Sequence, residues 1–185
     1  DLGHQGDITS KSVIDKNLQN SFVLKSRADG VISGIQVAEL SFKILDSSLN
    51  FKKKFNDGSI VKKEDIIATI DGFASSILSA ERTALNFLSH LSGIASATNE
   101  MVNLISETNT KIVSTRKTTP NLRILEKFAV KDGGGMNHRF GLYDGILIKD
   151  NHLALSGSIT NSVSLAREKC GHMVNIEVEV DNLDQ

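Results

Sequence analysis

The chain has 185 residues, of which 39% are hydrophobic and 23% charged, as in a globular protein with one full core or two small ones. Its net charge of −1 gives no reason to expect nucleic acid or a membrane as a partner, and a single cysteine excludes an internal disulfide. No apolar run approaches the roughly 20 residues that span a bilayer, and no secretory signal opens the chain. We therefore expect a cytoplasmic protein with an inert thiol at Cys170 and, since Asp1 is not Met, a natural N-terminus further upstream.

The N-terminal part predicts a small mixed sheet with one helix. Residues 1–20 are polar and predict an irregular entry. From Ser21 onward, short runs rich in β-branched residues are broken by glycine-containing turns, a pattern typical of strands. Residues 37–45 carry apolar side chains at helical spacing. The lysines at 52–54 and 62–63 are expected to be solvated edge residues.

Residues 73–109 predict helical structure with a continuous apolar stripe. Ser92 and Gly93 interrupt the pattern, and they predict a break or kink between two helices. Arg82 lies on the polar side of the first helix, beside Glu81, where a surface ion pair would contribute little to stability.

After Asn109 the pattern alternates between strand and helix, which predicts a parallel sheet or barrel with right-handed crossovers. A glycine run at 133–135 predicts a flexible loop. The expected elements are a strand at 111–115, a helix capped by Thr119 with Pro120 at its first position, a strand at 145–148, a helix near 158–169 and a strand at 174–180.

Positive charge is concentrated in residues 111–152, which contain eight basic and four acidic residues. The 110 residues before this stretch sum to −2 and the 33 residues after it to −3. A near-neutral chain that gathers its cations beside three consecutive glycines has the features of a site for polyanionic small molecules.

Each of the three predicted strands in this part ends in polar residues, at 115–117, 149–152 and 177–181. Ligands bind at the carboxyl ends of strands in α/β proteins, so three segments are expected to deliver charge to one rim. Arg116, Arg139 and Lys149 suit carboxylates or phosphates, the glycines let backbone amides approach an anion, and Glu177 and Glu179 share one strand face suited to a metal or a base. No zinc spacing, dinucleotide fingerprint, Walker loop or nucleophile elbow is present, so these features do not name a reaction.

Three segments resemble the quinolinate phosphoribosyltransferase family. They read ERTALNFLSHLSGIASAT (81–98), STRKTTPNLRILEKFAVKDGGGMNHRFGLYDGILIKDNH (114–152) and IEVEVDNL (176–183), and DLGHQGDITS at the start is similar to the family's early D-x-T segment. The resemblance covers essentially the whole chain in the right order.

The resemblance implies a small N-terminal α/β sandwich domain at 1–92, including the linking helix, and the first part of an incomplete, open α/β barrel at 93–185. It implies a homodimeric pentosyltransferase, or an assembly of dimers, that uses Mg²⁺. The enzyme would join quinolinate to phosphoribosyl pyrophosphate and give nicotinate mononucleotide, pyrophosphate and CO₂ in NAD biosynthesis.

The family's pattern also implies roles for individual residues. The two carboxylates of quinolinate would be held by Arg116, His138, Arg139 and Lys149, with Arg82 reaching in from the partner subunit. Lys117 and Glu179 would serve phosphoribosyl pyrophosphate and its magnesium, and Lys117, Lys149 and Glu179 would be the catalytic residues. His152, at the end of the IKDNH motif, would have a supporting role.

The chain departs from the family by stopping at Gln185, just after the third predicted barrel strand. The family's further strands carry another magnesium-associated aspartate and glycine-rich loops for the 5′-phosphate, so we expect a C-terminally truncated form. Two alternatives stay open: the related protein found with molybdate transport genes, and a non-catalytic anion-binding module that kept the barrel rim.

Overall fold

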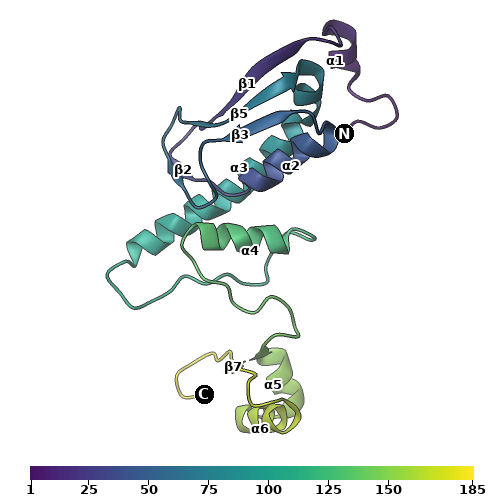
Figure 1. Ribbon diagram of the computed structural model, residues 1–185. Coiled ribbons are helices and arrows are strands. Elements are labelled where there is room, and N and C mark those ends of the chain that lie inside the picture. Colours follow the sequence, from purple (N-terminus) through teal and green to yellow (C-terminus); the bar gives the residue numbers. More distant parts are fainter. The chain divides into compact units, whose positions relative to one another are not determined.

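The computed structural model describes residues 1–185, which form two compact units, residues 1–137 and 138–185 (Figure 1). No helix in these residues is both long and apolar enough to cross a membrane. The first unit contains α1 (Ile8–Val13), β1 (Gln19–Lys25), β2 (Gly30–Val31), α2 (Ile35–Leu45), β3 (Asn50–Lys53), β4 (Ile60–Val61), β5 (Ile66–Phe73), α3 (Ala74–Leu104) and α4 (Arg123–Asp132). The second contains β6 (Ile146–Ile148), α5 (Asp150–Ser156), α6 (Ile159–Lys169) and β7 (Ile176–Val178).

The first unit is built on an antiparallel sheet in the order β1-β5-β3, with a separate two-stranded pair of β2 and β4. One of the expected glycine-containing turns forms at residues 56–59, with Ser59 N–H donating to the Asn56 carbonyl at 3.1 Å and Gly58 at φ +83°. Figure 1 shows α2 and the beginning of α3 on one face of this sheet. The prediction of a small sheet with a helix is therefore confirmed, but the sheet is antiparallel throughout and not mixed, and a second helix covers it as well.

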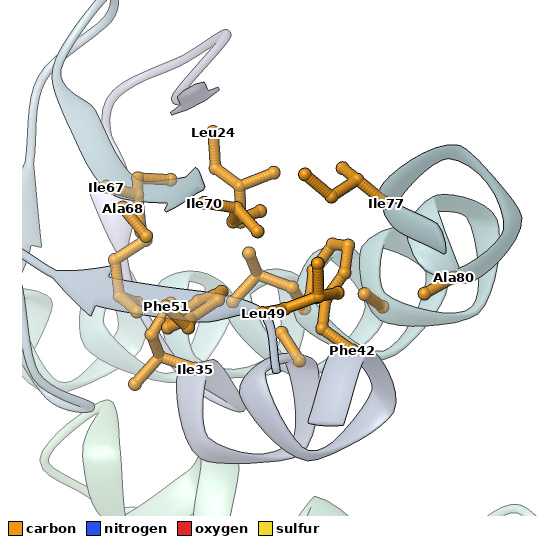
Figure 2. Packing of buried hydrophobic residues seen from close by; sticks show 14 of the residues in the cluster. Leu24, Ile35, Phe42, Leu49, Phe51, Ile67, Ala68, Ile70, Ile77 and Ala80 are labelled. Atoms are coloured by element: carbon orange, nitrogen blue, oxygen red, sulfur yellow. The ribbon is translucent and has the colours of Figure 1, made fainter. Parts of the chain in front are cut away.

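The core of this unit lies between the sheet and the two helices (Figure 2). Phe42 from α2 and Phe51 from β3 form a tilted aromatic pair with ring centroids 5.9 Å apart. Ile35, Leu49 and Ile70 fill the space around the pair and are almost completely buried. Burial of such side chains stabilises the fold by roughly 1.5–3 kcal/mol each, so this cluster supplies much of the unit's stability.

The predicted break at Ser92 and Gly93 is wrong, because α3 is one continuous helix of 31 residues. Its buried stripe, which includes Leu88, Leu91 and Ala95, continues past the glycine without a change of face. Ser92 also accepts a hydrogen bond from the Ser33 backbone N–H at 3.1 Å. Tertiary packing of this stripe therefore outweighs the helix-propensity cost of one glycine, about 1 kcal/mol.

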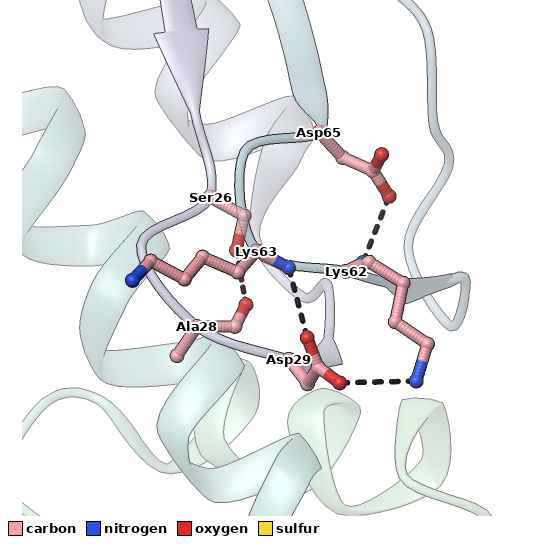
Figure 3. A network of polar contacts seen from close by, with 6 residues as sticks. All are labelled: Ser26, Ala28, Asp29, Lys62, Lys63 and Asp65. Atoms are coloured by element: carbon pink, nitrogen blue, oxygen red, sulfur yellow. Dashed lines mark hydrogen bonds and ion pairs between the residues drawn. The ribbon is translucent and has the colours of Figure 1, made fainter.

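The lysines at 62 and 63 lie on the surface, as expected (Figure 3). The Lys62 ammonium contacts Asp29 at 3.0 Å with 72% of its side chain exposed, while the other Asp29 oxygen accepts the Lys63 backbone N–H at 2.8 Å. Asp29 thus joins two turns mainly through the hydrogen bond from the Lys63 backbone, since exposed ion pairs contribute at most about 1 kcal/mol.

The N-terminal segment is more regular than predicted. Asp7 caps α1 by accepting the Ser10 backbone N–H at 3.0 Å, and β1 begins at Gln19. The Asp7 and Ser10 spacing is a cap signal that the polar composition of residues 1–20 concealed.

Two expectations after α3 need correction. The strand at 111–115 is reduced to an isolated parallel bridge between Val113 and Met136. The next helix begins at Arg123 and not at Pro120, because Asn121 takes a positive φ of 66°, which a right-handed helix does not allow.

The second unit contains a parallel pair of strands joined by two helices. β6 and β7 pair in parallel, with Ile148 opposite Val178, and α5 and α6 form the connection between them. Ser158 caps α6 by accepting the Asn161 N–H at 3.1 Å, so the helix predicted near 158–169 is confirmed, as are both strands in shortened form. This strand–helix–strand unit is the building block of an α/β barrel.

Candidate functional site

The residues predicted to form the site fall into two groups, one in each unit. Arg82, Arg116 and Lys117 belong to the first unit, and the second contains His138, Arg139, Lys149 and Glu179.

The carboxyl ends of β6 and β7 bring Lys149 and Glu179 together. Both residues directly follow the paired positions Ile148 and Val178, and Glu179 N–H donates to the Ile148 carbonyl at 2.9 Å. The Lys149 ammonium lies 2.8 Å from Glu179 Oε2, with side chains 42% and 53% exposed. The prediction that parallel strands deliver charged groups to one edge is confirmed for these two strands.

His152 supports this edge from the first turn of α5. Its Nδ1 accepts the backbone N–H of Lys149 at 2.9 Å, so a neutral ring carries its proton on Nε2. This hydrogen bond fixes the start of α5 next to Lys149.

His138 pairs with Glu177, one of the two carboxylates on the strand face expected to suit a metal or a base. His138 Nε2 lies 2.7 Å from Glu177 Oε2, and the histidine side chain is 29% exposed. The alternation of Glu177 and Glu179 along β7 was the signal for this contact, because both side chains point to the same face of the strand.

The loop between Arg139 and Gly145 is ordered by its own hydrogen bonds. Asp144 accepts the backbone N–H groups of Phe140 at 2.6 Å and Gly141 at 2.8 Å. Arg139 Nη1 donates to the Gly145 carbonyl at 3.0 Å, which holds the guanidinium beside the start of β6. Its remaining N–H groups give a planar donor set suited to a carboxylate.

Arg116 and Lys117 lie in a tight turn in the first unit. Thr118 N–H donates to the Arg116 carbonyl at 3.0 Å, and Lys117 N–H donates to Thr115 Oγ1 at 3.1 Å. Lys117 is exposed, whereas Arg116 is partly buried and its Nε is fully buried without a hydrogen-bond partner. A buried guanidinium nitrogen without a partner costs free energy that an anionic ligand can recover.

Glu126 and Lys127 of α4 hydrogen-bond to residues on either side of this turn. The pattern of apolar residues in the sequence did not indicate that they are buried. The apolar Phe128 is 59% exposed, while the charged Glu126 and Lys127 are 8% and 3% exposed. Two adjacent charged residues inside a helix were the available signal, because residues of this kind are buried only when they have partners.

The Glu126 carboxyl is held ionised by its neighbours. Burial acts to raise its pKa, but hydrogen bonds from His90 and Thr119 outweigh this effect and hold the pKa below the ordinary value of 4.5. The carboxylate therefore carries its charge at neutral pH and acts only as a hydrogen-bond acceptor.

The glycine run at 133–135 does not offer its amides to an anion, contrary to expectation. The N–H groups of Gly133, Gly134 and Gly135 donate to the carbonyls of Ala129, Lys131 and Val130, respectively, at the end of α4. A Cβ at Gly133 would lie 2.3 Å from the Ala95 carbonyl oxygen, and Gly134 has φ +89°. The glycines are thus required for a helix end packed against α3.

Arg82 is exposed on α3, two residues before the buried Ala84. In residues 1–185 no group of three or more His, Cys, Asp or Glu side chains is placed to hold a metal ion. A carboxylate at this edge, such as Glu179, has the hard oxygen donors that Mg²⁺ prefers when phosphate oxygens and water complete its shell.

Comparison with known proteins gives the same result for both halves of the chain. The family model described as quinolinate phosphoribosyl transferase, N-terminal domain, matches residues 7–92, and the model described as its C-terminal domain matches residues 94–185. The probable nicotinate-nucleotide pyrophosphorylase [carboxylating] of Bacillus subtilis is 46% identical over all of this chain and 63% of the relative. Quinolinate phosphoribosyltransferase [decarboxylating] 1b of Nicotiana tabacum is 39% identical over 97% of this chain and 51% of its own length.

Solved structures agree. The nicotinate-nucleotide pyrophosphorylase of Ehrlichia chaffeensis is 40% identical with a TM-score of 0.93, over all of this chain and 67% of that one. The protein of the same name from Francisella tularensis is 38% identical with a TM-score of 0.93, over 98% of this chain and 64% of that one. The α/β fold with a small N-terminal domain is confirmed, and the chain spans between half and two thirds of the length of these proteins.

Proposed function

The chain belongs to the quinolinate phosphoribosyl transferase family, and we propose that it binds quinolinate and takes part in transfer of a phosphoribosyl group to it. The products would be nicotinate mononucleotide, pyrophosphate and CO₂, in the biosynthesis of NAD. The observation that carries the proposal is the set of cations in the segments matched by the family, above all Arg116 with its buried, unpartnered Nε. The matches described above are to proteins named for the quinolinate reaction, which favours this proposal over the molybdate-associated relative and the non-catalytic module.

Quinolinate carries two adjacent carboxylates, and four cationic or hydrogen-bonding side chains are proposed to bind them. Arginine binds carboxylates by two parallel N–H···O bonds, whereas lysine acts as a point charge. We assign these roles to Arg116 and Arg139 and to Lys149, with His138 held by Glu177 as an additional donor. Two carboxylates bound in this way distinguish quinolinate from pyridines with one carboxylate.

The chemistry needs few protein groups. The pyridine nitrogen forms a bond to the ribose C1 while the bond from C1 to pyrophosphate breaks, and the departing oxygen keeps the electron pair. Clustered cations such as Lys117 stabilise that developing charge. The ribosylated nitrogen is positive, so the adjacent carboxylate can leave as CO₂ and the remaining ring carbon takes a proton. The protein must only release that carboxylate from its salt bridges.

Magnesium is proposed as the cation that neutralises the pyrophosphate group. It is commonly bound by one or two carboxylates together with substrate phosphates and water, and Glu179 offers an exposed carboxylate of this type. Binding of the ion would require Glu179 to exchange its contact with Lys149, which would then be free to face the anionic substrate.

We also propose a homodimer in which Arg82 contributes to the partner's site. The exposed position of Arg82 on α3 supports this proposal, because an exposed guanidinium is available to a second subunit. Mixing an Arg82→Ala variant with an Arg116→Ala variant tests it. Recovery of about a quarter of the quinolinate binding sites, as random exchange of subunits gives, would support shared sites, and no recovery would contradict them.

A direct test of the reaction uses quinolinate with a ¹³C label in the 2-carboxylate. The chain is incubated with this substrate, phosphoribosyl pyrophosphate and Mg²⁺, and labelled CO₂ and nicotinate mononucleotide are measured. Formation of both, dependent on phosphoribosyl pyrophosphate and lost in Lys149→Ala, is the expected result. Absence of both products would contradict a catalytic role for this chain.

A further inference from the structure

Side chains of α4 hydrogen-bond to the segment of residues 114–119, which contains Arg116 and Lys117. We call Arg123, Glu126 and Lys127 the α4 clamp. These residues lie within one and a half turns of a single helix, yet they contact both ends of the segment.

At the far end of the segment, the clamp acts through a buried carboxylate. Glu126 Oε2 accepts the backbone N–H of Thr119 at 3.1 Å, and Oε1 accepts His90 Nε2 at 2.9 Å. His90 lies on α3, so the carboxylate connects two helices and the segment at one point. Both oxygens are satisfied, as a buried charge requires.

At the near end, the clamp acts through a buried ammonium group. Lys127 Nζ donates to Ser114 Oγ at 2.8 Å, and that hydroxyl donates to Asn137 Oδ1 at 3.0 Å. Between the two ends, Arg123 Nε donates to Thr118 Oγ1 at 3.1 Å. Three side chains of one helix thus bind residues 114, 118 and 119.

The composition of α4 shows that the clamp is not needed simply to attach the helix. Ile124 and Phe128, which could bury apolar surface, are 58% and 59% exposed, while Glu126 and Lys127 are turned inward. Burial of two charges stabilises a fold less than burial of apolar side chains of similar size. A helix selected only for stability would therefore face the other way.

We propose that Glu126 is a positioning residue that fixes Arg116 and Lys117 for their anionic ligand, with Lys127 holding the other end of the segment. The inference rests on the proposed function, in which Arg116 binds a quinolinate carboxylate. Arg116 lies between the two ends of the segment that the α4 clamp holds, and its Nε is buried without a partner. The direction of the Arg116 side chain therefore depends on the backbone of the segment. A displacement of about 1 Å at such a group can reduce activity by about a hundredfold.

The test compares Glu126→Ala, the conservative Glu126→Gln and the control Glu100→Gln, which lies on the exposed side of α3. Amide hydrogen exchange is measured by NMR in the free protein. We expect exchange of the Thr119 N–H to rise at least about tenfold in Glu126→Ala, and to stay near the wild-type rate in Glu126→Gln and Glu100→Gln. His90→Ala, an exposed substitution, removes a support of the same carboxylate should Glu126→Ala fail to fold. Unchanged exchange in both variants would overturn the inference.

Quinolinate affinity, measured by calorimetry, separates positioning from general destabilisation. We expect Glu126→Ala to weaken binding about tenfold in the wild-type background and only about twofold in an Arg116→Lys background, because both changes act through the same contact. An equal loss in both backgrounds would overturn a role through Arg116. A wild type that does not bind quinolinate would contradict the proposed function. The exchange rates alone would then test whether Glu126 holds residues 114–119 in place.

Discussion

The two groups of candidate site residues are held in different ways. In residues 114–119, Arg116 and Lys117 are fixed indirectly, through buried charges of the α4 clamp that contact the backbone and hydroxyls of the segment. At the ends of β6 and β7, Lys149 and Glu179 are exposed and contact each other directly. The first group is therefore anchored to the folded interior, although Lys117 itself is exposed, whereas the second is a surface pair positioned by strand register.

This difference predicts how each group responds to change. A buried carboxylate with two hydrogen bonds is coupled to stability, and its removal leaves other buried groups without partners. An exposed ion pair is nearly neutral for stability, so its charges can be exchanged for ligand or metal at little cost. Substitutions at Lys149 and Glu179 should therefore change ligand binding with little change in stability, whereas substitutions at Glu126 should change both.

The largest effect is expected for Arg116→Ala. Quinolinate affinity should fall by about a hundredfold or more, since each charge-assisted hydrogen bond contributes roughly 1.5–3 kcal/mol. Isothermal titration measures the affinity, and circular dichroism checks that the fold is retained. Arg27→Ala, at an exposed loop arginine, is the matched control. Unchanged affinity in Arg116→Ala would remove this residue from the site.

The next effect concerns the glycines that place α4 against α3. Gly133→Ala should lower the free energy of unfolding by about 1–3 kcal/mol, because its Cβ would meet the Ala95 carbonyl oxygen at 2.3 Å. Gly93→Ala, where a Cβ meets nothing within 4 Å, should instead stabilise α3 by about 0.5–1 kcal/mol. Urea denaturation measures both. Equal effects would show that the close approach is not real.

A smaller effect is expected in the pH dependence of stability. The pKa of Glu126 is lowered in the folded chain, so its contribution is present above the ordinary value of 4.5 and is lost as the pH falls through the folded pKa. Glu126→Gln should therefore reduce the loss of stability on acidification below pH 4.5. Thermal unfolding at several pH values tests this, and identical acid profiles for both proteins would contradict the assignment.

The smallest effect is expected at the strand ends. Lys149→Ala and Glu179→Ala should each change the free energy of unfolding by less than about 1 kcal/mol, because both side chains are about half exposed. Lys149→Ala should nevertheless weaken quinolinate binding. A loss of stability of several kcal/mol would place this pair in the folded interior and remove the contrast with the α4 clamp.

The sequence predicted the elements with a strong local pattern. The strands around β6 and β7, the helix α6 and the pairing of their carboxyl ends follow from alternation and from the register of parallel strands. The domain division at 92/93 stays a prediction: the family models divide there, while the compact units divide after residue 137. The role of Lys117 likewise stays a prediction.

The remaining features depend on tertiary contacts that no local pattern encodes. Gly93 sits inside a continuous helix because Leu88, Leu91 and Ala95 are buried along it, and the run at 133–135 serves the end of a helix instead of an anion. The partners of Glu126 lie at positions 90 and 119, on segments that only the folded chain brings together. Buried charge in an amphipathic helix can be suspected from sequence, but its partner cannot be named.

The central claim is that this chain binds a pyridine dicarboxylate through both carboxylates. Calorimetric titration of the 185-residue protein with quinolinate and with nicotinate tests it most directly. We predict saturable binding of quinolinate and affinity for nicotinate at least about tenfold weaker, because nicotinate lacks one of the two carboxylates. Equal binding of both ligands, or no binding of quinolinate by the folded protein, would contradict the account.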